Sequence, residues 1–486
     1  MNNWKVTYRG YEDEEELLRE ALCTLGNGYF ATRGAAEECR AGDFHYPGTY
    51  LAGGYNRLET EVSGRVIENE DLVNWPNWLL LTFRPEEGEW FHIDEVNVFH
   101  FEQDLDLKEG VLTRRLHFED EHRRGWELVS RRIISMADPH LAVLQWQLTP
   151  KNWSGKIQVY SELDGRVTNS GVARYQDLNG RHLEVLETGQ FEEEGISLKV
   201  RTRQSEIVMV QAARTRLMTG TPDRPIQRKT IEKENRIGQQ LATEISENKP
   251  LFVEKVVALY TSRDRAISDP LQEARKAAMR APDFEGIYQA HIAHWQELWE
   301  RADIELDMED DRDQPLLRLH IFHLFQTCSA HSIDLDVGVP ARGWHGEAYR
   351  GHIFWDELFI FPFLNTSMPE LARSLLLYRY RRLPEARQAA REAGYEGAMF
   401  PWQSGSNGRE ESQVLHLNPK SGRWIPDHTR LQRHVNAAIV FNIWQYYQVT
   451  NDLEFINSYG GEIILEIARF WASCVQYNEA RRRYEI

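Results

Sequence analysis

Residues 251–280 read LFVEKVVALYTSRDRAISDPLQEARKAAMR, and the change of pattern inside this stretch decides the fold. Its first part, Phe252–Thr261, has the period-two alternation that is typical of a strand. Ser268, Asp269 and Pro270 then supply a helix N-cap and a proline for the first helical turn, which predicts a helix through about Arg280. The sequence therefore predicts β structure before this stretch and helices after it.

The region before the change is predicted to be a large antiparallel β-sandwich. Short period-two segments recur there and are separated by turn signals such as Asp138-Pro139. The segments are Val111–Phe118, Trp126–Ser135, Leu141–Leu148, Lys156–Leu163, Ile196–Arg203, Glu206–Ala212 and Phe252–Thr261. We place one domain, the β-sandwich, at residues 1–265.

The rest of the chain is predicted to be helical. Residues 266–313 form a linker, whose second helix begins near Asp283 and carries an apolar stripe from Phe284 to Leu298. Residues 314–486 show apolar stripes of helical period, and two Gly- and Pro-rich loops, 338–351 and 400–429, lie between them. No fixed-length repeat accompanies these helices, so we expect part of an α/α toroid rather than a solenoid.

Composition and charge exclude several classes of function. A formal net charge of −18 argues against a nucleic-acid surface, which needs surplus Lys and Arg. No apolar run approaches the roughly 18 residues of a membrane span. Residues 1–30 lack a secretory signal pattern, and the four cysteines are widely scattered, so we expect a cytoplasmic protein with reduced thiols.

The stretch from Arg342 to Phe363, RGWHGEAYRGHIFWDELFIFPF, has the composition of a sugar-binding loop. Carboxylates such as Glu347 and Asp356 accept hydrogen bonds from the vicinal hydroxyls of a pyranose. Trp344 and Trp355 offer flat walls for its C–H faces. The alternative is a turn followed by a half-buried helix start whose tryptophans belong to the core. Composition alone leaves both interpretations open.

A second loop, Glu396–His428, repeats this chemistry. Its candidate ligand-binding residues are Trp402, Gln403, Arg409, Glu410, Glu411, Lys420, Arg423, Trp424 and Asp427. Two loops of one composition favour a carbohydrate cleft. In the alternative interpretation Glu410 and Glu411 form a solvated turn and Trp424 is a core residue.

Metal, nucleotide and serine-hydrolase chemistry have little support. His320 and His323, with His331 further on, are spaced for a metal, but no HExxH or His-x-His cluster accompanies them, so helix histidines are the favoured interpretation. Gly26-Asn27-Gly28 resembles part of a phosphate loop but has no Walker lysine, and no G-x-S-x-G elbow occurs. We therefore predict neither a metal nor another cofactor.

Three segments together resemble glycoside hydrolase family 65, which includes the maltose, trehalose and kojibiose phosphorylases and related α-glucoside hydrolases. They are TLGNGYFATRG at Thr24–Gly34, GHIFWDELFIFPFL at Gly351–Leu364, and FPWQSG with HLNP in Phe400–Pro419. The resemblance runs from about Tyr8 to the last residue. It implies a β-sandwich, a helical linker and a catalytic (α/α)6 barrel, in agreement with the change of period.

The resemblance also implies a reaction and its partners. An α-glucosidic bond is cleaved with inversion: a glutamic acid protonates the leaving oxygen, and inorganic phosphate or an activated water attacks the opposite face. The partners are a small α-glucoside and, in phosphorolysis, phosphate as co-substrate, and enzymes of this kind often form homodimers. By the resemblance, Trp355 and Asp356 line the glucosyl subsite, and Trp402 is similarly placed. The remaining substrate-binding predictions are Gln403, Arg342, Glu347 and Glu410.

The chain departs from the family pattern in two places. Many relatives read FWDTE, whereas Asp356 is followed here by Glu357 and Leu358, so the usual glutamate is absent. No Gly-Pro-Asp-Glu-Tyr segment, which carries the general acid in relatives, occurs before Ile486. We therefore expect a truncated barrel in residues 314–486, no catalytic residue within this chain, and a general acid downstream of Ile486.

Two other functions stay open at this point. One is an α-glucoside hydrolase of the same family, in which a second carboxylate activates water. The other is a non-catalytic carbohydrate-binding protein, or a subunit whose missing half another chain supplies. Both keep the sandwich and the sugar-binding loops.

Overall fold

The computed structural model describes residues 3–62, 64–219, 225–307 and 313–486, which form two compact units. Unit 1 consists of Met1–Leu51, Asn74–Asn169 and Arg181–Gln326. Unit 2 consists of Ala52–Val73, Ser170–Gly180 and Thr327–Ile486. Two short segments from the first half of the sequence therefore belong to the same unit as the C-terminal helices.

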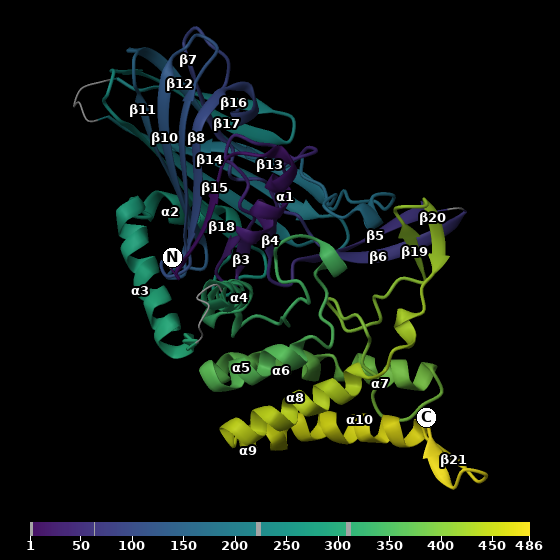
Figure 1. The fold of residues 1–486 in the computed structure, drawn as a ribbon. Coiled ribbons are helices and arrows are strands. Elements are labelled where there is room, and N and C mark those ends of the chain that lie inside the picture. The colour runs from purple at the N-terminus through teal and green to yellow at the C-terminus, as the bar shows by residue number, and fades with distance from the viewer. Residues whose placement is uncertain (1–2, 63, 220–224, 308–312) are drawn as a thin grey trace. The chain divides into compact units, whose positions relative to one another are not determined.

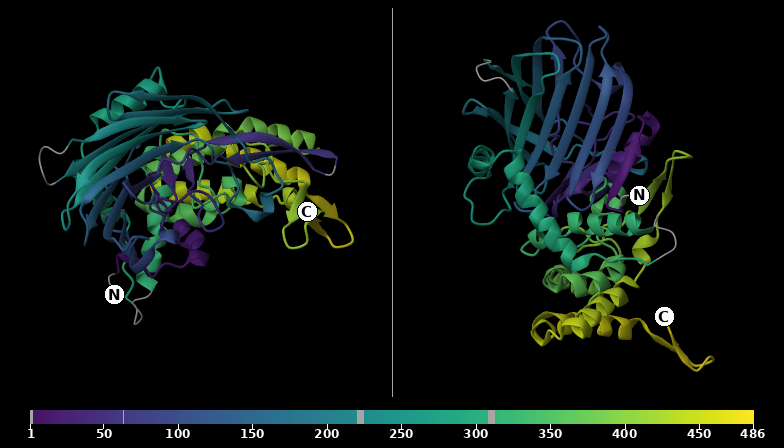
Figure 2. Two further views of the ribbon diagram at one scale, coloured as in Figure 1. Left: turned by 90° about the horizontal axis from the view of Figure 1, so that it is seen from above. Right: turned by 60° about the vertical axis from the view of Figure 1, so that its left-hand side comes forward.

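Unit 1 is an antiparallel β-sandwich, as the period-two segments predict (Figure 1). Many strands of its nine-stranded sheet are seen side by side in the right-hand view of Figure 2. In sheet order these strands are β1 (Lys5–Arg9), β8 (Asn97–Asp106), β9 (Val111–Glu119), β10 (Gly125–Ile134), β11 (Leu141–Pro150), β18 (Leu251–Thr261), β15 (Val208–Thr219), β14 (Gly195–Thr202) and β13 (Leu183–Phe191).

Among the described residues of unit 1, two smaller sheets accompany the large one. One contains β16 (Gln227–Lys233), β17 (Arg236–Ile245), β12 (Gly155–Asp164) and β7 (Leu81–Pro85), in that order. The other contains β2 (Leu25–Gly26), β3 (Phe30–Thr32) and β4 (Thr49–Leu51). Inward residues such as Ile157 and Val159 of β12 and Leu198 and Val200 of β14 are fully buried, which explains the period-two pattern.

The described helices of unit 1 are α1 (Asp13–Leu22), α2 (Pro270–Arg280), α3 (Phe284–Ala302) and α4 (Asp313–Thr327), whose last residue belongs to unit 2. Two helices of unit 1, α2 and α3, begin where the sequence predicts, at Pro270 and just after Asp283. The Asp269 carboxylate accepts a hydrogen bond from the backbone N–H of Leu271 at 3.0 Å, which caps α2. Ala274 and Ala278 of α2 are buried against Val210 and Val256 of the large sheet.

In its described residues, unit 2 combines helices with three β-hairpins. Its hairpins pair β5 (Tyr55–Val62) with β6 (Arg65–Leu72), β19 (Leu415–Asn418) with β20 (Arg423–Pro426), and β21 (Gln476–Asn478) with β22 (Arg483–Glu485). The helices are α5 (Glu357–Ser367), α6 (Pro369–Arg381), α7 (Leu383–Glu392), α8 (Val435–Thr450), α9 (Leu453–Phe455) and α10 (Gly461–Cys474), with a π-helical turn at Ile456–Gly460.

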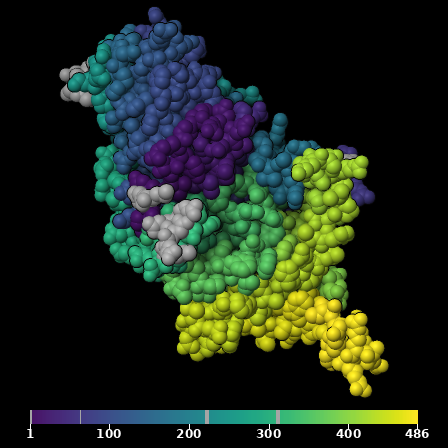
Figure 3. Space-filling view, in the orientation of Figure 1, coloured from purple at the N-terminus to yellow at the C-terminus, as the bar shows by residue number. Residues whose placement is uncertain are grey.

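The predicted apolar stripes of unit 2 pack against one another. Helices α5, α6 and α10 all contact α8, and Figure 1 shows them side by side. Leu364 of α5, Leu375 of α6, Ile443 of α8 and Ile467 of α10 are at most 1% exposed and form part of this core. The hairpin β21–β22 protrudes from these helices, at the yellow end of Figure 3.

Nothing in the helices resembles a membrane segment. Of the helices in the four described ranges, none combines the length and the apolar character that crossing a bilayer requires.

Candidate functional site

Trp355 and Asp356 lie in the turn that starts α5. The backbone N–H groups of Leu358 and Phe359 donate to the carbonyls of Trp355 and Asp356, at 2.9 and 3.0 Å. Asp356 therefore occupies the N-cap position, so both side chains are fixed by the first turn of a helix rather than by a free loop.

A buried ion pair between Arg379 and Glu357 holds this turn in place. Arg379 of α6 donates to the Glu357 carboxylate at 2.8 Å and to the Phe354 carbonyl at 3.1 Å. The other Glu357 oxygen accepts the backbone N–H of Val339 at 3.2 Å. Glu357 is 3% exposed, so it holds the loop in place and is closed to a ligand.

Aromatic rings gather beside this turn, and we call them the aromatic cluster: Tyr349, Phe354, Trp355, Trp402 and His434. The rings of Trp355 and Trp402 are stacked, with centroids 6.5 Å apart and planes inclined by 29°. The His434 ring contacts both tryptophans, at centroid distances of 5.1 and 4.8 Å. The structure thus joins the two sequence loops through their tryptophans, and both side chains stay partly exposed.

Asp356 is the polar group of this surface. Its side chain is half-buried, and burial raises the pKa of its carboxyl, while its own backbone N–H and the positive charge of Arg342 oppose that rise. Within the described part of the chain, no side chain hydrogen-bonds to this carboxylate. Arg342 is exposed, and its guanidinium carbon lies 5.6 Å from the centroid of the Tyr349 ring. Asp356 and Arg342 therefore lie beside the aromatic cluster with groups open to a ligand.

Gln403 and Glu410 join the second loop to itself and to the first. The Glu410 carboxylate accepts the backbone N–H groups of Trp402, Gln403 and Ser412, at 2.8, 3.2 and 3.0 Å. The Gln403 side-chain amide donates to the Tyr349 carbonyl at 3.3 Å. Both Glu410 oxygens are thus occupied by the protein's own backbone, and this carboxylate orients Trp402.

Glu347 and Trp344 point inward. Glu347 is 4% exposed, and its carboxylate accepts the backbone N–H of Gly171 at 3.0 Å. Trp344 is 3% exposed, so it belongs to the core and offers no stacking face. The interpretation of this loop as partly core is therefore right for Trp344.

The distal part of the second loop lies apart from the aromatic cluster. It forms the hairpin β19–β20, in which His416 and Asp427 are paired at 3.2 Å. Trp424 of β20 is partly exposed, and among the described residues its ring makes no contact with the rings of the cluster. Lys420 and Arg423 are exposed on the same hairpin.

His434 is the cluster residue that the sequence reasoning missed. It stands at the N-cap of α8, 32 positions after Trp402 and 79 after Trp355, outside both loops. Neither composition nor periodicity marks such a residue. A histidine flanking the start of a strongly periodic helix is the only signal it carries.

The histidines at 320, 323 and 331 do not form a metal site with acidic or cysteine neighbours. In the part of the chain that the structure describes, no three His, Cys, Asp or Glu side chains converge as a metal ion would need.

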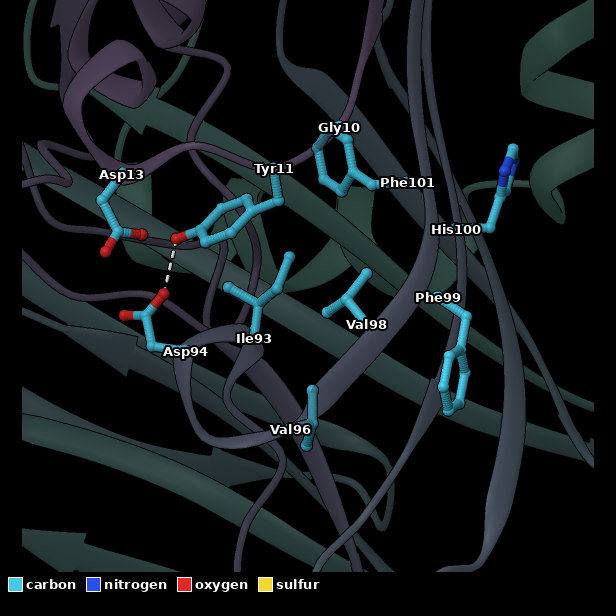
Figure 4. A pocket seen from close by; sticks show the side chains of 10 residues that line it. All are labelled: Gly10, Tyr11, Asp13, Ile93, Asp94, Val96, Val98, Phe99, His100 and Phe101. Carbon is cyan, nitrogen blue, oxygen red and sulfur yellow. Dashed lines mark hydrogen bonds between the residues drawn. The ribbon is translucent and has the colours of Figure 1, made fainter.

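A separate hollow of about 420 Å³ lies on unit 1, between the start of α1 and strand β8 (Figure 4). The Tyr11 hydroxyl donates to Asp94 across one end at 2.6 Å, and the exposed ring of Phe99 lies at the other end. None of the sequence-predicted site residues lines it.

Family models match nearly the whole chain. The N-terminal domain of glycosyl hydrolase family 65 matches residues 6–298, and the central catalytic domain of the same family matches residues 318–486.

Individual relatives are longer than this chain. An uncharacterised glycosyl hydrolase of Mycobacterium tuberculosis is 44% identical over 99% of this chain and 36% of its own length. A kojibiose phosphorylase of Halothermothrix orenii is 34% identical over 100% of this chain and 61% of its own length. The chain thus spans between about a third and three fifths of these relatives.

A solved structure confirms the fold. A putative kojibiose phosphorylase from the human microbiome superimposes with a TM-score of 0.82 at 21% identity, over 99% of this chain and 61% of that one. The predicted order, an antiparallel β-sandwich followed by helices of an (α/α)6 barrel, agrees with this match. With both family domains matched in sequence, the chain belongs to glycosyl hydrolase family 65.

Proposed function

We propose that this chain supplies the glucosyl-binding part of an inverting α-glucoside phosphorylase of the kojibiose type. The observation that carries the proposal is the stacked pair of Trp355 and Trp402 beside the open carboxylate of Asp356. The two rings offer an apolar wall to the C–H face of a glucosyl unit, and Asp356 accepts hydrogen bonds from its hydroxyls. Arg342 is close enough for its positive charge to act on the Asp356 carboxyl, and its guanidinium suits an anionic co-substrate such as phosphate.

The state of the other carboxylates favours phosphorolysis over hydrolysis. An inverting hydrolase needs a second carboxylate to activate water, whereas phosphate is itself a nucleophile. Glu347 is bonded to a backbone N–H, Glu357 to Arg379, and Glu410 to three backbone N–H groups. None of these three glutamates is thus free to act as a base beside Asp356.

The bonded state of these three glutamates also bears on the location of the general acid. These glutamates hold the loops together, so we propose none of them as the general acid. The kojibiose phosphorylase relative is longer than the 61% of its length that this chain matches, and we propose that the acid lies in a region corresponding to that further part. Residues 1–486 alone are then expected to bind the sugar and to turn it over slowly or not at all.

The test compares products and binding. The longest form of the protein that its gene encodes, incubated with kojibiose and phosphate, should release β-glucose 1-phosphate, detected by ³¹P NMR, because inversion of an α-linkage gives the β-phosphate. Trehalose and maltose serve as alternative substrates. Release of glucose without a sugar phosphate would favour the hydrolase, and binding without turnover would favour the carbohydrate-binding protein. Rapid phosphorolysis by residues 1–486 alone would refute the placement of the acid.

A further inference from the structure

Three consecutive residues shortly before Trp355 have backbone φ angles in the left-handed region. Tyr349, Arg350 and Gly351 have φ angles of 54°, 58° and 66°. Each non-glycine residue in this region costs roughly 1–2 kcal/mol, so such a run persists only where the surroundings hold it in place. Since Trp355 and Asp356 follow within five residues, whatever holds this run also sets their position.

The hairpin β5–β6, from the first part of the sequence, holds this run. The Tyr55 hydroxyl donates to the Gly351 carbonyl at 2.5 Å, and the Arg350 guanidinium pairs with Asp71 at 3.2 Å. Leu72 fills the space beside Gly351, where an added Cβ would lie 2.5 Å from the Leu72 Cβ. Arg350 is 1% exposed, so its ion pair with Asp71 lies inside the unit.

The same hairpin holds the second loop through Glu70. One Glu70 oxygen accepts the backbone N–H of Ser406 at 2.8 Å, and the other accepts the Ser406 hydroxyl at 2.5 Å. Gly405 gives Glu70 this access, because a Cβ there would lie 1.7 Å from the carboxylate oxygen.

A partly buried arginine extends the Glu70 contact along the loop. Arg57 of β5 bridges Glu70 and Glu411, at 3.0 and 2.6 Å. Glu70 is 2% and Glu411 6% exposed, and burying two neighbouring carboxylates is costly unless each is bonded, as it is here. Burial and the charge of Glu411 raise the pKa of Glu70.

The two held segments are also joined to each other. The backbones of Ile353 and Ser404 exchange two hydrogen bonds, at 2.9 and 3.0 Å. Ile353 lies two residues before Trp355, and Ser404 two residues after Trp402. A shift of either segment is thus passed to the tryptophan pair.

We propose that the hairpin β5–β6 positions the tryptophan pair of the glucosyl subsite, with Glu70 and Tyr55 as positioning residues for the second and first loop. The proposal deepens the proposed function and rests on it for the role of the sugar. Glu70 and Tyr55 act through the loops and touch no reacting atom.

The test measures the tryptophan geometry directly. Two stacked indoles 6.5 Å apart produce an exciton couplet in circular dichroism, and Trp355→Phe in residues 1–486 identifies its contribution. We expect Glu70→Gln to weaken the couplet and to raise the Kd for kojibiose about tenfold, the effect of losing a charge-assisted contact that fixes the loop. The matched control is Glu61→Gln, an exposed carboxylate on the same hairpin, which should leave both readouts unchanged.

A second variant keeps the test decisive. Tyr55→Phe keeps the ring against His352 and removes only the hydroxyl that donates to Gly351, so it should weaken the couplet in a protein with native far-ultraviolet dichroism. If Glu70→Gln does not fold, Tyr55→Phe alone decides whether the hairpin positions the tryptophan pair. A native couplet and an unchanged Kd in a folded variant would overturn the proposal. Absence of kojibiose binding by the unaltered chain would instead refute the proposed function, and the couplet would still decide the role of the hairpin.

Discussion

The two units place their unusual backbone and their buried charges differently. In unit 1, left-handed non-glycine residues such as Arg123, Asn235 and Asn248 stand alone in turns between strands. In unit 2, Tyr349 and Arg350 are consecutive and are followed by left-handed Gly351. An isolated left-handed residue closes a hairpin, whereas a run of them must be held by distant contacts. The left-handed residues of the sandwich thus close local turns, whereas those before Trp355 are held by contacts from a distant part of the sequence.

The buried charges of the two units differ in what they hold in place. In unit 1, Arg114 pairs with Glu37 and Glu38 of one segment, at 2.7 and 2.6 Å, and these contacts tie the interior of the sandwich together. In unit 2, Glu70 and Arg57 connect the hairpin β5–β6 to a loop more than 330 residues later. The first network stabilises a scaffold, while the second positions ligand-binding side chains. Variants of each network should therefore have different readouts.

The largest expected effect is on the stability of the sandwich. Arg114→Met removes the cation that is bonded to both buried carboxylates, Glu37 and Glu38, which costs about 3–5 kcal/mol of unfolding free energy. Urea denaturation measures this loss of unfolding free energy. The neighbouring Arg115→Met removes a partly exposed ion pair with Asp104 and should cost less than about 1 kcal/mol. Equal losses from both variants would contradict the role of the buried network.

The next effect is a pH dependence of the same unit. Burial lowers the pKa of His291 from 6.5 to about 4, with Met136 N–H donating to its ring and the ring bonded to the Gly110 carbonyl. The unfolded chain therefore binds more protons between pH 6.5 and 4, so this contribution is present above pH 6.5 and is lost as pH falls toward 4. This contribution of His291 to the free energy of unfolding amounts to at most about 3 kcal/mol.

Urea denaturation at several pH values checks this prediction. His291→Gln should flatten the stability profile in that window, and His294→Gln, an exposed residue of the same helix whose charge is the smallest cause of the lowered pKa, should change it only slightly. An identical profile for the His291 variant and the unaltered chain would show that another group causes the acid sensitivity.

The smallest expected effect concerns binding rather than stability. Trp402→Ala removes one stacking face and should raise the Kd for kojibiose by roughly tenfold, equivalent to about 1.4 kcal/mol. Trp424→Ala, in the same sequence loop but on the hairpin β19–β20, should leave the Kd unchanged. Calorimetric titration compares the two. A larger loss from Trp424→Ala would move the sugar site to the hairpin.

The sequence predicts the scaffold well because its signals are local. Alternation locates strands β9–β12, β14, β15 and β18, and the Asp269-Pro270 pair locates the start of α2. The hairpin β5–β6 escapes this reasoning, because its buried residues include Asn69, Glu70 and Asp71. A carboxylate is expected at the surface unless its partner is known, and the partner of Glu70 is Ser406.

The sequence predicts the candidate site only in part, because some of its contacts join residues that are far apart in the chain. Sugar chemistry marks Trp355, Asp356 and Trp402, which the structure brings together. Composition cannot tell that Glu347 and Glu410 are bonded to backbone N–H groups, since that depends on where the loops fold. The substrate-binding roles, the boundaries at residues 265 and 313, and a homodimer stay predictions.

The central claim is that Asp356, beside the stacked tryptophans, binds the glucosyl unit. Calorimetric titration of residues 1–486 with kojibiose tests it most directly, using the unaltered chain and Asp356→Asn. Asparagine keeps the size of the side chain and removes the charge that strengthens hydrogen bonds to hydroxyls. We predict saturable binding at one site, weakened at least about tenfold by Asp356→Asn. No binding by the unaltered chain, or equal affinity of the two proteins, would contradict the account.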